Sequence, residues 1–127
     1  MSRIRGTKTK PEELVRKFLF SKGFRYRIND KRYSGTPDIV LPKYHTIIFI
    51  NGCFWHGHEN CKAAELPLTN TEFWRKKISE NRVRDWKNIE TLKKDGWDVI
   101  VIWQCEIKNK NNRDKRMELL FGEILGK

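Results

Sequence analysis

Apolar side chains recur at helical spacing near both ends of the chain. After a capping box at residues 9–12, with proline in the first turn, one apolar stripe predicts a helix that Gly23 can end. The members of that stripe are Leu14, Val15, Phe18 and Leu19. Toward the C-terminus, a second stripe predicts a helix over residues 113–125. Its inward-facing members are Met117, Leu120 and Ile124.

Apolar and β-branched runs between these helices predict four strands. Residues 24–28 alternate apolar and basic side chains, as a half-exposed strand does. Residues 38–41 and 46–50 predict two strands joined by a short turn at Pro42 and Lys43. The second of these strands is apolar enough to be buried on both faces. Residues 97–103 predict a further buried strand.

A long irregular segment and a long charged helix separate the last two strands. Residues 51–70 form the irregular segment, and loops of that length in a small domain are usually functional or held by a staple. Residues 71–94 predict the helix, which Gly96 closes. The order α-β-β-β-α-β-α predicts an α/β layered fold. Without repeats or linkers, residues 1–127 are expected to form one domain, with residues 1–8 as a basic arm.

Charge changes this picture by indicating a polyanionic partner. Lys and Arg outnumber Asp and Glu by 27 to 16, which gives a net charge of +11. Nucleic acid is the first expectation. A membrane-surface role is set aside because no basic amphipathic helix with an aromatic face is evident. No apolar stretch approaches the ~20 residues that cross a bilayer, and no secretory signal is evident, so we expect a cytoplasmic protein with reduced cysteines.

The segment from Cys53 to Cys61 has the composition of a metal site. It holds two cysteines and two histidines, which are common ligands of tetrahedral zinc. Cys105 follows the strand at residues 97–103 and would join them if that strand lay beside the one at residues 46–50. Spacing alone leaves open whether His56 or His58 is the ligand. The alternative is that Cys53 and Cys105 are small core residues and the histidines line a surface loop.

Asp38 is placed where a catalytic carboxylate could work. Pro37 precedes it and an apolar strand follows, so the side chain would be exposed at the end of the strand. Nucleases with a Pro-Asp motif hold Mg²⁺ against the scissile phosphate with such a carboxylate. Pro-Asp also occurs in ordinary turns, and its weight here comes from the neighbouring strands and the cysteine-histidine cluster.

Taken together, these segments resemble the Vsr endonucleases of very short patch repair, which nick DNA beside a T:G mismatch. The resemblance runs over residues 1–106. It rests on SGTPDIV at 34–40, IFINGCFWHGH at 48–58, EFW at 72–74, NRVRD at 81–85 and GWDVIVIWQC at 96–105. It implies a restriction-endonuclease-like three-layer core with a central mixed sheet and a structural zinc site.

The resemblance also implies roles for individual residues. Asp38 would bind catalytic Mg²⁺ together with the main-chain carbonyl of Ile50. His56 would act as general base, with Glu12 as a supporting carboxylate that can also serve the capping box. Asn51 stands where the family often has a second histidine, and asparagine can hydrogen-bond a phosphate oxygen but cannot relay a proton. Structural zinc would be held by four ligands: Cys53, His58, Cys61 and Cys105.

Contacts with DNA are the remaining implication. Phe54 and Trp55 would be inserted as an aromatic wedge beside the mismatch. Phosphate contacts are expected from Arg3, Arg5 and Lys10, and the chain begins where the family usually has a longer basic arm. The basic side chains of the long helix are interpreted mainly as a solvated face. These side chains are Arg75, Lys76, Lys77, Arg82, Arg84 and Lys87.

The function expected on this basis is Mg²⁺-dependent nicking of mismatched duplex DNA, 5′ to the thymine. The protein would act as a monomer at the bacterial nucleoid, with repair proteins as further partners. One alternative is a restriction-like nuclease for another lesion or site. A second alternative is a zinc-stabilised DNA-binding module without catalysis, which would have no need of Asp38, His56 and Glu12.

Overall fold

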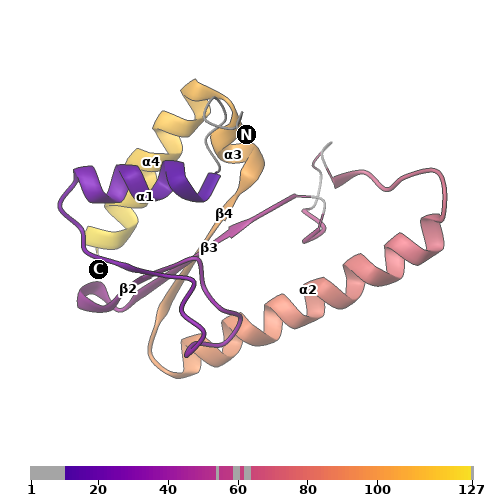
Figure 1. Cartoon of the computed structure of the whole chain (residues 1–127), viewed down its shortest axis with the longest axis horizontal. Helices are drawn as coiled ribbons and strands as arrows, with labels where there is room; N and C mark the ends of the chain where they lie inside the picture. The colour runs from indigo at the N-terminus through magenta and orange to yellow at the C-terminus, as the bar shows by residue number, and fades with distance from the viewer. Residues whose placement is uncertain (1–10, 54, 59–60, 62–63, 127) are drawn as a thin grey trace, which may run out of the picture.

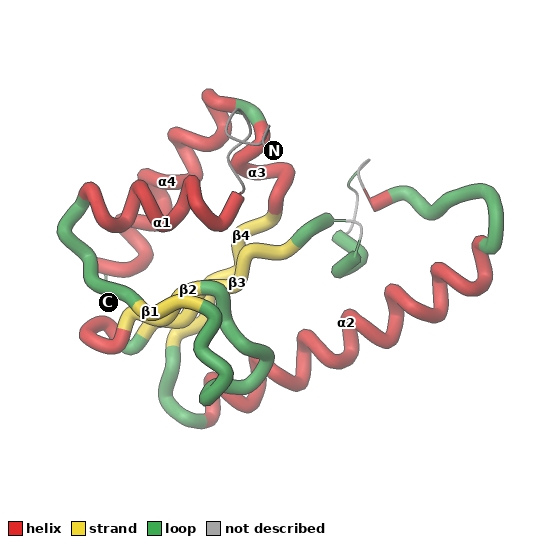
Figure 2. The backbone as a smooth tube through the Cα atoms, viewed as in Figure 1, coloured by secondary structure: helices red, strands yellow, loops and turns green. Residues whose placement is uncertain are grey.

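A mixed sheet of four strands, in the order β1-β2-β3-β4, lies at the centre of the fold (Figure 1), and all four strands are labelled in Figure 2. The structure is a computed structural model that describes residues 11–53, 55–58, 61 and 64–126. The strands are β1 (Arg27–Ile28), β2 (Ile39–Leu41), β3 (Thr46–Asn51) and β4 (Asp98–Trp103). β1, β2 and β3 pair antiparallel, whereas β3 and β4 run parallel. The chain therefore leaves β3 and β4 at the same end of the sheet.

Helices cover both faces of this sheet. They are α1 (Pro11–Ser21), α2 (Thr71–Lys94), α3 (Gln104–Lys108) and α4 (Lys110–Leu125). α1, α3 and α4 lie on one side of the strands and α2 crosses on the other, as Figure 1 shows. Successive strand residues alternate between the faces, so Ile39 and Leu41 join the core with α1 and α4, while Val40 packs with Leu92 of α2. The predicted layered α/β fold with a mixed sheet is confirmed.

The inner face of α2 is partly polar. Ile78 and Leu92 are buried on it. Asn81, Asp85 and Asn88 fall between them at the three- and four-residue spacing that keeps side chains on one face of a helix. These three positions are half-buried. The helix therefore presents hydrogen-bonding groups to the rest of the molecule.

Several predicted elements are confirmed. α2 has the predicted bounds, and the predicted inward side chains Met117, Leu120 and Ile124 are buried in α4. The turn between β2 and β3 is a short 3₁₀ helix, η2 (Pro42–Tyr44). None of the helices in the described ranges has an apolar stretch long enough to span a bilayer.

The strand predicted at residues 24–28 is wrong in extent, because only Arg27–Ile28 is a strand. The N–H of Phe24 donates to the carbonyl of Leu19 at 3.1 Å, so its backbone serves the end of α1. The Phe24 ring packs edge-on against Tyr44 and Phe121 in the core.

Two further predictions near the C-terminus need correction. β4 was predicted to be buried but is mostly half-buried, because it lies at the edge of the sheet. The element order also contains α3, which was not predicted, and α4 begins at Lys110 rather than at residue 113. Asn109 caps α4 by accepting hydrogen bonds from the N–H groups of Asn111 and Asn112. The basic arm and the first two residues of the N-terminal capping box, Thr9 and Lys10, lie outside the described residues.

Candidate active site and metal centre

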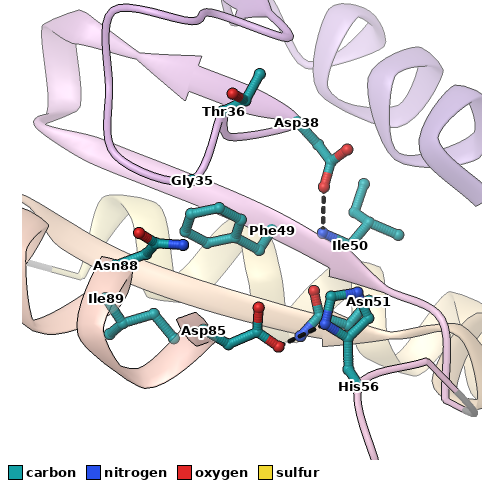
Figure 3. A pocket seen from close by; sticks show the side chains of 10 residues that line it. All are labelled: Gly35, Thr36, Asp38, Phe49, Ile50, Asn51, His56, Asp85, Asn88 and Ile89. Atoms are coloured by element: carbon teal, nitrogen blue, oxygen red, sulfur yellow. Dashed lines mark hydrogen bonds and ion pairs between the residues drawn. The ribbon is translucent and has the colours of Figure 1, made fainter. Parts of the chain in front are cut away.

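A cleft of about 220 Å³ opens between the end of β3, the segment before β2 and the middle of α2 (Figure 3). Predicted catalytic residues Asp38, Asn51 and His56 all line it. Ile50 lines it as well, and Glu12 of α1 lies outside this lining. The remaining lining residues are Gly35, Thr36, Phe49, Asp85, Asn88 and Ile89. Figure 3 shows Asp38 on one side of the cleft, across from His56 and Asp85.

Asp38 immediately precedes β2, as predicted, and its carboxylate is held at the mouth of the cleft. Its Oδ2 accepts a hydrogen bond from the Ile50 N–H at 2.7 Å. Burial raises the pKa of Asp38, and the bond from Ile50 opposes this increase. The negative charge of Glu12 also raises the pKa, which indicates that this carboxylate lies close to Asp38. Ionisation of Asp38 therefore costs more here than in water, and a nearby cation would offset that cost.

His56 is paired with Asp85 of α2, a residue whose role the sequence analysis missed. The Nδ1 of His56 lies 2.5 Å from Oδ2 of Asp85, and both side chains are about one-third exposed. Because a carboxylate only accepts, this contact keeps a proton on Nδ1 and leaves Nε2 as the ring nitrogen able to take a proton. The N–H of His56 also bonds to the Gly52 carbonyl at 3.2 Å. The pair has the form of an oriented general base.

Asp85 did leave a signal in the sequence. It falls on the same helical face as the apolar residues Ile78 and Leu92, where a charged side chain needs a partner. Its surroundings obscured this, because the neighbouring positions are strongly charged and exposed. The basic side chains named above on α2 are all exposed, in agreement with the predicted solvated face.

The predicted zinc ligands converge on one point. One ligand atom from each of Cys53, His58, Cys61 and Cys105 lies within 4.8 Å of the others, and these residues come from the loop after β3 and the start of α3. Sγ of Cys105 lies 3.5 Å from Nδ1 of His58. A tetrahedral zinc ion with ligands at 2.0–2.3 Å requires ligand separations of roughly 3.5–3.8 Å. The cluster could therefore hold a metal ion.

The electrostatics of the cluster favour a cation. Burial, together with the neighbouring thiols of Cys53 and Cys61, raises the pKa of Cys105 to about 12. A metal ion reverses this situation because it stabilises thiolates. The ring of His58 is stacked on Trp103 at 4.0 Å, which fixes its orientation beside the cysteines. This supports the metal-site interpretation over the alternative of small core cysteines.

Gly57 allows the two histidines to serve different sites. Its φ is +60°, and a Cβ there would approach Ile78 to 2.6 Å and Arg82 to 2.8 Å. A glycine is required at such a position. His56 before it reaches the cleft and His58 after it reaches the cysteines.

Trp55 of the predicted wedge is exposed over 53% of its surface. Its carbonyl accepts a hydrogen bond from Asn81 Nδ2 at 2.9 Å, and its ring packs edge-on against Trp74. The other predicted DNA contacts lie outside the described residues. These are Phe54, Arg3, Arg5 and Lys10.

Comparison with known proteins gives the class to which this site belongs. The family model described as DNA mismatch endonuclease Vsr matches residues 1–62. The chain is 56% identical over 124 residues to the type II nicking enzyme V.NmeAIP of Neisseria meningitidis, covering 98% of this chain and 88% of the relative. It is 41% identical over 117 residues to the type II nicking enzyme V.XorIIP of Xanthomonas oryzae, covering 92% and 85%. It is 37% identical over 99 residues to the DNA mismatch endonuclease Vsr of Escherichia coli, covering 78% and 63%.

These matches and the carboxylate-histidine cleft make the protein a DNA endonuclease. The chain belongs to the Vsr family.

Proposed function

We propose that this protein nicks one strand of duplex DNA at a T:G mismatch, 5′ to the thymine, in a Mg²⁺-dependent reaction of very short patch repair. The observation that carries the proposal is the cleft in which Asp38 faces the His56–Asp85 pair. The name of the Escherichia coli relative, a DNA mismatch endonuclease, supports the choice of substrate. The net charge of +11 suits a polyanionic substrate.

Asp38 and the main-chain carbonyl of Ile50 would hold the Mg²⁺ ion, with Glu12 as a supporting carboxylate. Oxygen donors suit this cation, and its charge would offset the cost of ionising a partly buried Asp38. When bound, Mg²⁺ supplies charge stabilisation at the phosphate that is attacked. Asp38 would be kept in place by the hydrogen bond from the Ile50 N–H.

His56 would take a proton from the attacking water through Nε2, while Asp85 holds the imidazole in that tautomer. Asn51 is 8% exposed, lines the same cleft and has an amide that could donate to a phosphate oxygen. These residues account for water activation and phosphate binding within one cavity.

Trp55, with Phe54 beside it in the sequence, would insert into the duplex at the mismatch, where base stacking is cheapest to open. Its exposure and its position next to His56 support this role. The ion held by the cysteines and His58 would be zinc with a structural role, because the four protein donors complete a tetrahedral shell. Phosphate contacts from Arg3, Arg5 and Lys10 belong to the same proposal.

We also propose that residues 1–127 form one domain with a restriction-endonuclease-like core. It would act as a monomer in the bacterial cytoplasm, at the nucleoid and with repair proteins as partners. The three-layer arrangement of helices and mixed sheet supports this core.

A second candidate function is nicking at a fixed site in paired DNA. The relatives named type II nicking enzymes favour it. This candidate uses the same cleft and differs from the first only in the duplex that is recognised.

The test is incubation of the purified protein, with and without Mg²⁺, on a duplex carrying one T:G mismatch and on its fully paired counterpart. We expect a single-strand nick confined to the mismatched duplex, dependent on Mg²⁺ and abolished by Asp38→Ala. Nicking of both duplexes would support the second candidate. Binding without any cutting would contradict both and favour a zinc-stabilised binding module.

A further inference from the structure

Ser34 and Gly35 contact Asn88 of α2 directly, at one wall of the cleft. Ser34 Oγ donates a hydrogen bond to Asn88 Oδ1 at 2.8 Å, between residues 54 apart in the sequence. Gly35 has a φ of +81°, and a Cβ there would lie 2.9 Å from Asn88 Nδ2 and 3.1 Å from Asn88 Cβ. Any other residue at position 35 would be strained at this positive φ and would displace the Asn88 side chain. The contact is thus both hydrogen-bonded and closely packed.

The segment held in this way leads straight to Asp38. The N–H of Thr36 bonds to the Tyr33 carbonyl at 3.1 Å, and the buried Pro37 follows with its fixed φ. Few freely rotating bonds therefore separate the contact at Ser34 and Gly35 from the Asp38 carboxylate.

The same face of α2 holds the other half of the site. Asp85, which contacts His56, lies about one helical turn before Asn88. Figure 3 shows both side chains projecting from α2 toward the cleft, with Gly35 above Asn88. The positions of Asp38 and His56 are therefore both set by contacts with neighbouring turns of one helix, α2.

We propose that Asn88 is a positioning residue that sets the separation of Asp38 from His56 through its contact with Ser34 and Gly35. This inference rests on the proposed nuclease function. Hydrolysis needs the phosphate and the general base in a narrow range of geometry, and a displacement of ~1 Å can cost about 10²-fold in rate. Losing one hydrogen bond would allow a smaller shift, so we expect a loss of about 10-fold.

The experiment measures single-turnover cutting rate and duplex affinity for Asn88→Ala, Ser34→Ala and the double variant, on a substrate that the wild type cuts. Each single variant should lose about 10-fold in rate with unchanged affinity, and the double variant should lose no more than either, because both act through one bond. Ser34→Thr keeps the hydroxyl and should retain the wild-type rate. Ser79→Ala, at an exposed position of α2, is the matched control.

Additive losses, or a loss of affinity with an unchanged rate, would overturn the proposal. If Asn88→Ala fails to fold, the comparison of Ser34→Ala with Ser34→Thr decides it, since these changes leave α2 intact. A wild type that cuts no duplex contradicts the proposed function itself. A wild type that cuts, beside Ser34→Ala and Asn88→Ala that cut equally well, contradicts only the positioning role.

Discussion

The metal cluster and the cleft are built from the same loop but in opposite ways. In the cluster, sulfur and nitrogen atoms from four residues lie within 4.8 Å of one another. In the cleft, the polar groups form separate pairs, Asp38 with the Ile50 N–H and His56 with Asp85, around a cavity of about 220 Å³. A closed set of protein ligands suits a structural ion, and an open set leaves room for water and substrate. On the proposed function, the contrast would separate a part that stabilises the fold from a part that reacts.

The largest expected effect is a loss of stability when the cysteine-histidine cluster is altered. Cys105→Ser should release the metal and lower the free energy of unfolding by several kcal/mol, or roughly 15 °C in Tm, because the ion links the loop to α3. Metal content by elemental analysis and thermal unfolding measure this. His45→Asn changes a histidine outside the cluster and should leave both values unchanged. Full metal content in Cys105→Ser would show that this cysteine is not a ligand.

In the cleft, Asp38→Asn should lower the cutting activity while raising the stability of the fold. Cutting should fall by about 10³-fold as the metal-binding carboxylate is lost. Without Mg²⁺ at neutral pH, the variant should be more stable than the wild type, because burial disfavours the ionised carboxylate.

The size of this stability change depends on pH. The folded-state pKa of Asp38 is raised, so its ionisation costs stability above that pKa, and the cost disappears below the ordinary pKa of 3.8, where both states are protonated. The gain in Tm should therefore shrink as the pH is lowered toward 4. A variant less stable than the wild type at every pH would contradict the account of Asp38.

A smaller loss is expected from Asp85→Asn, which keeps the shape of the side chain but removes its charge. The cutting rate should fall by about 10²-fold, because the His56 imidazole is no longer held in one tautomer. Metal content should not change, since the closed cluster is untouched. The pH profile of the cutting rate and the metal content are measured together. A loss of metal in this variant would show that the two regions are coupled.

The smallest effect should appear at the wedge. Trp55→Ala removes an exposed ring, so stability should change little, while the preference for mismatched over paired duplex should fall by about 10-fold. Competition between the two duplexes in one reaction measures this ratio directly. Phe73→Ala, at another exposed ring, serves as the control. An unchanged ratio would remove Trp55 from mismatch recognition.

Local patterns predicted the long elements well and indicated a cysteine-histidine cluster. α2 has clear ends, with Glu72 in its first turn and Gly96 after it at a φ of +93°, and the interior of β3 is apolar. The cysteines and His58 were assigned as ligands on the resemblance to the Vsr endonucleases, and their convergence in space agrees with it.

The open site was only partly predictable, because its partners lie far apart in the sequence. Asp85 is 29 residues from His56 and stands in a charged helix, where most side chains face solvent. Ser34 and Asn88 have ordinary loop and helix compositions, and only the crossing of α2 over the sheet brings them together. The predictions for short elements failed for a related reason. The conformations at Phe24 and in α3 are set by hydrogen bonds at helix ends, which leave no periodic pattern in the sequence.

The parallel pairing of β3 with β4 has a consequence for the order of events during synthesis. α2 must be complete before β4 can reach its partner, and Cys105 leaves the ribosome after both. Under the proposed metal role, Cys53, His58 and Cys61 would form an incomplete ligand set while about forty further residues are added. Metal capture would then finish only when the sheet closes, so loading of the ion and registration of the last strand would become a single late step of folding.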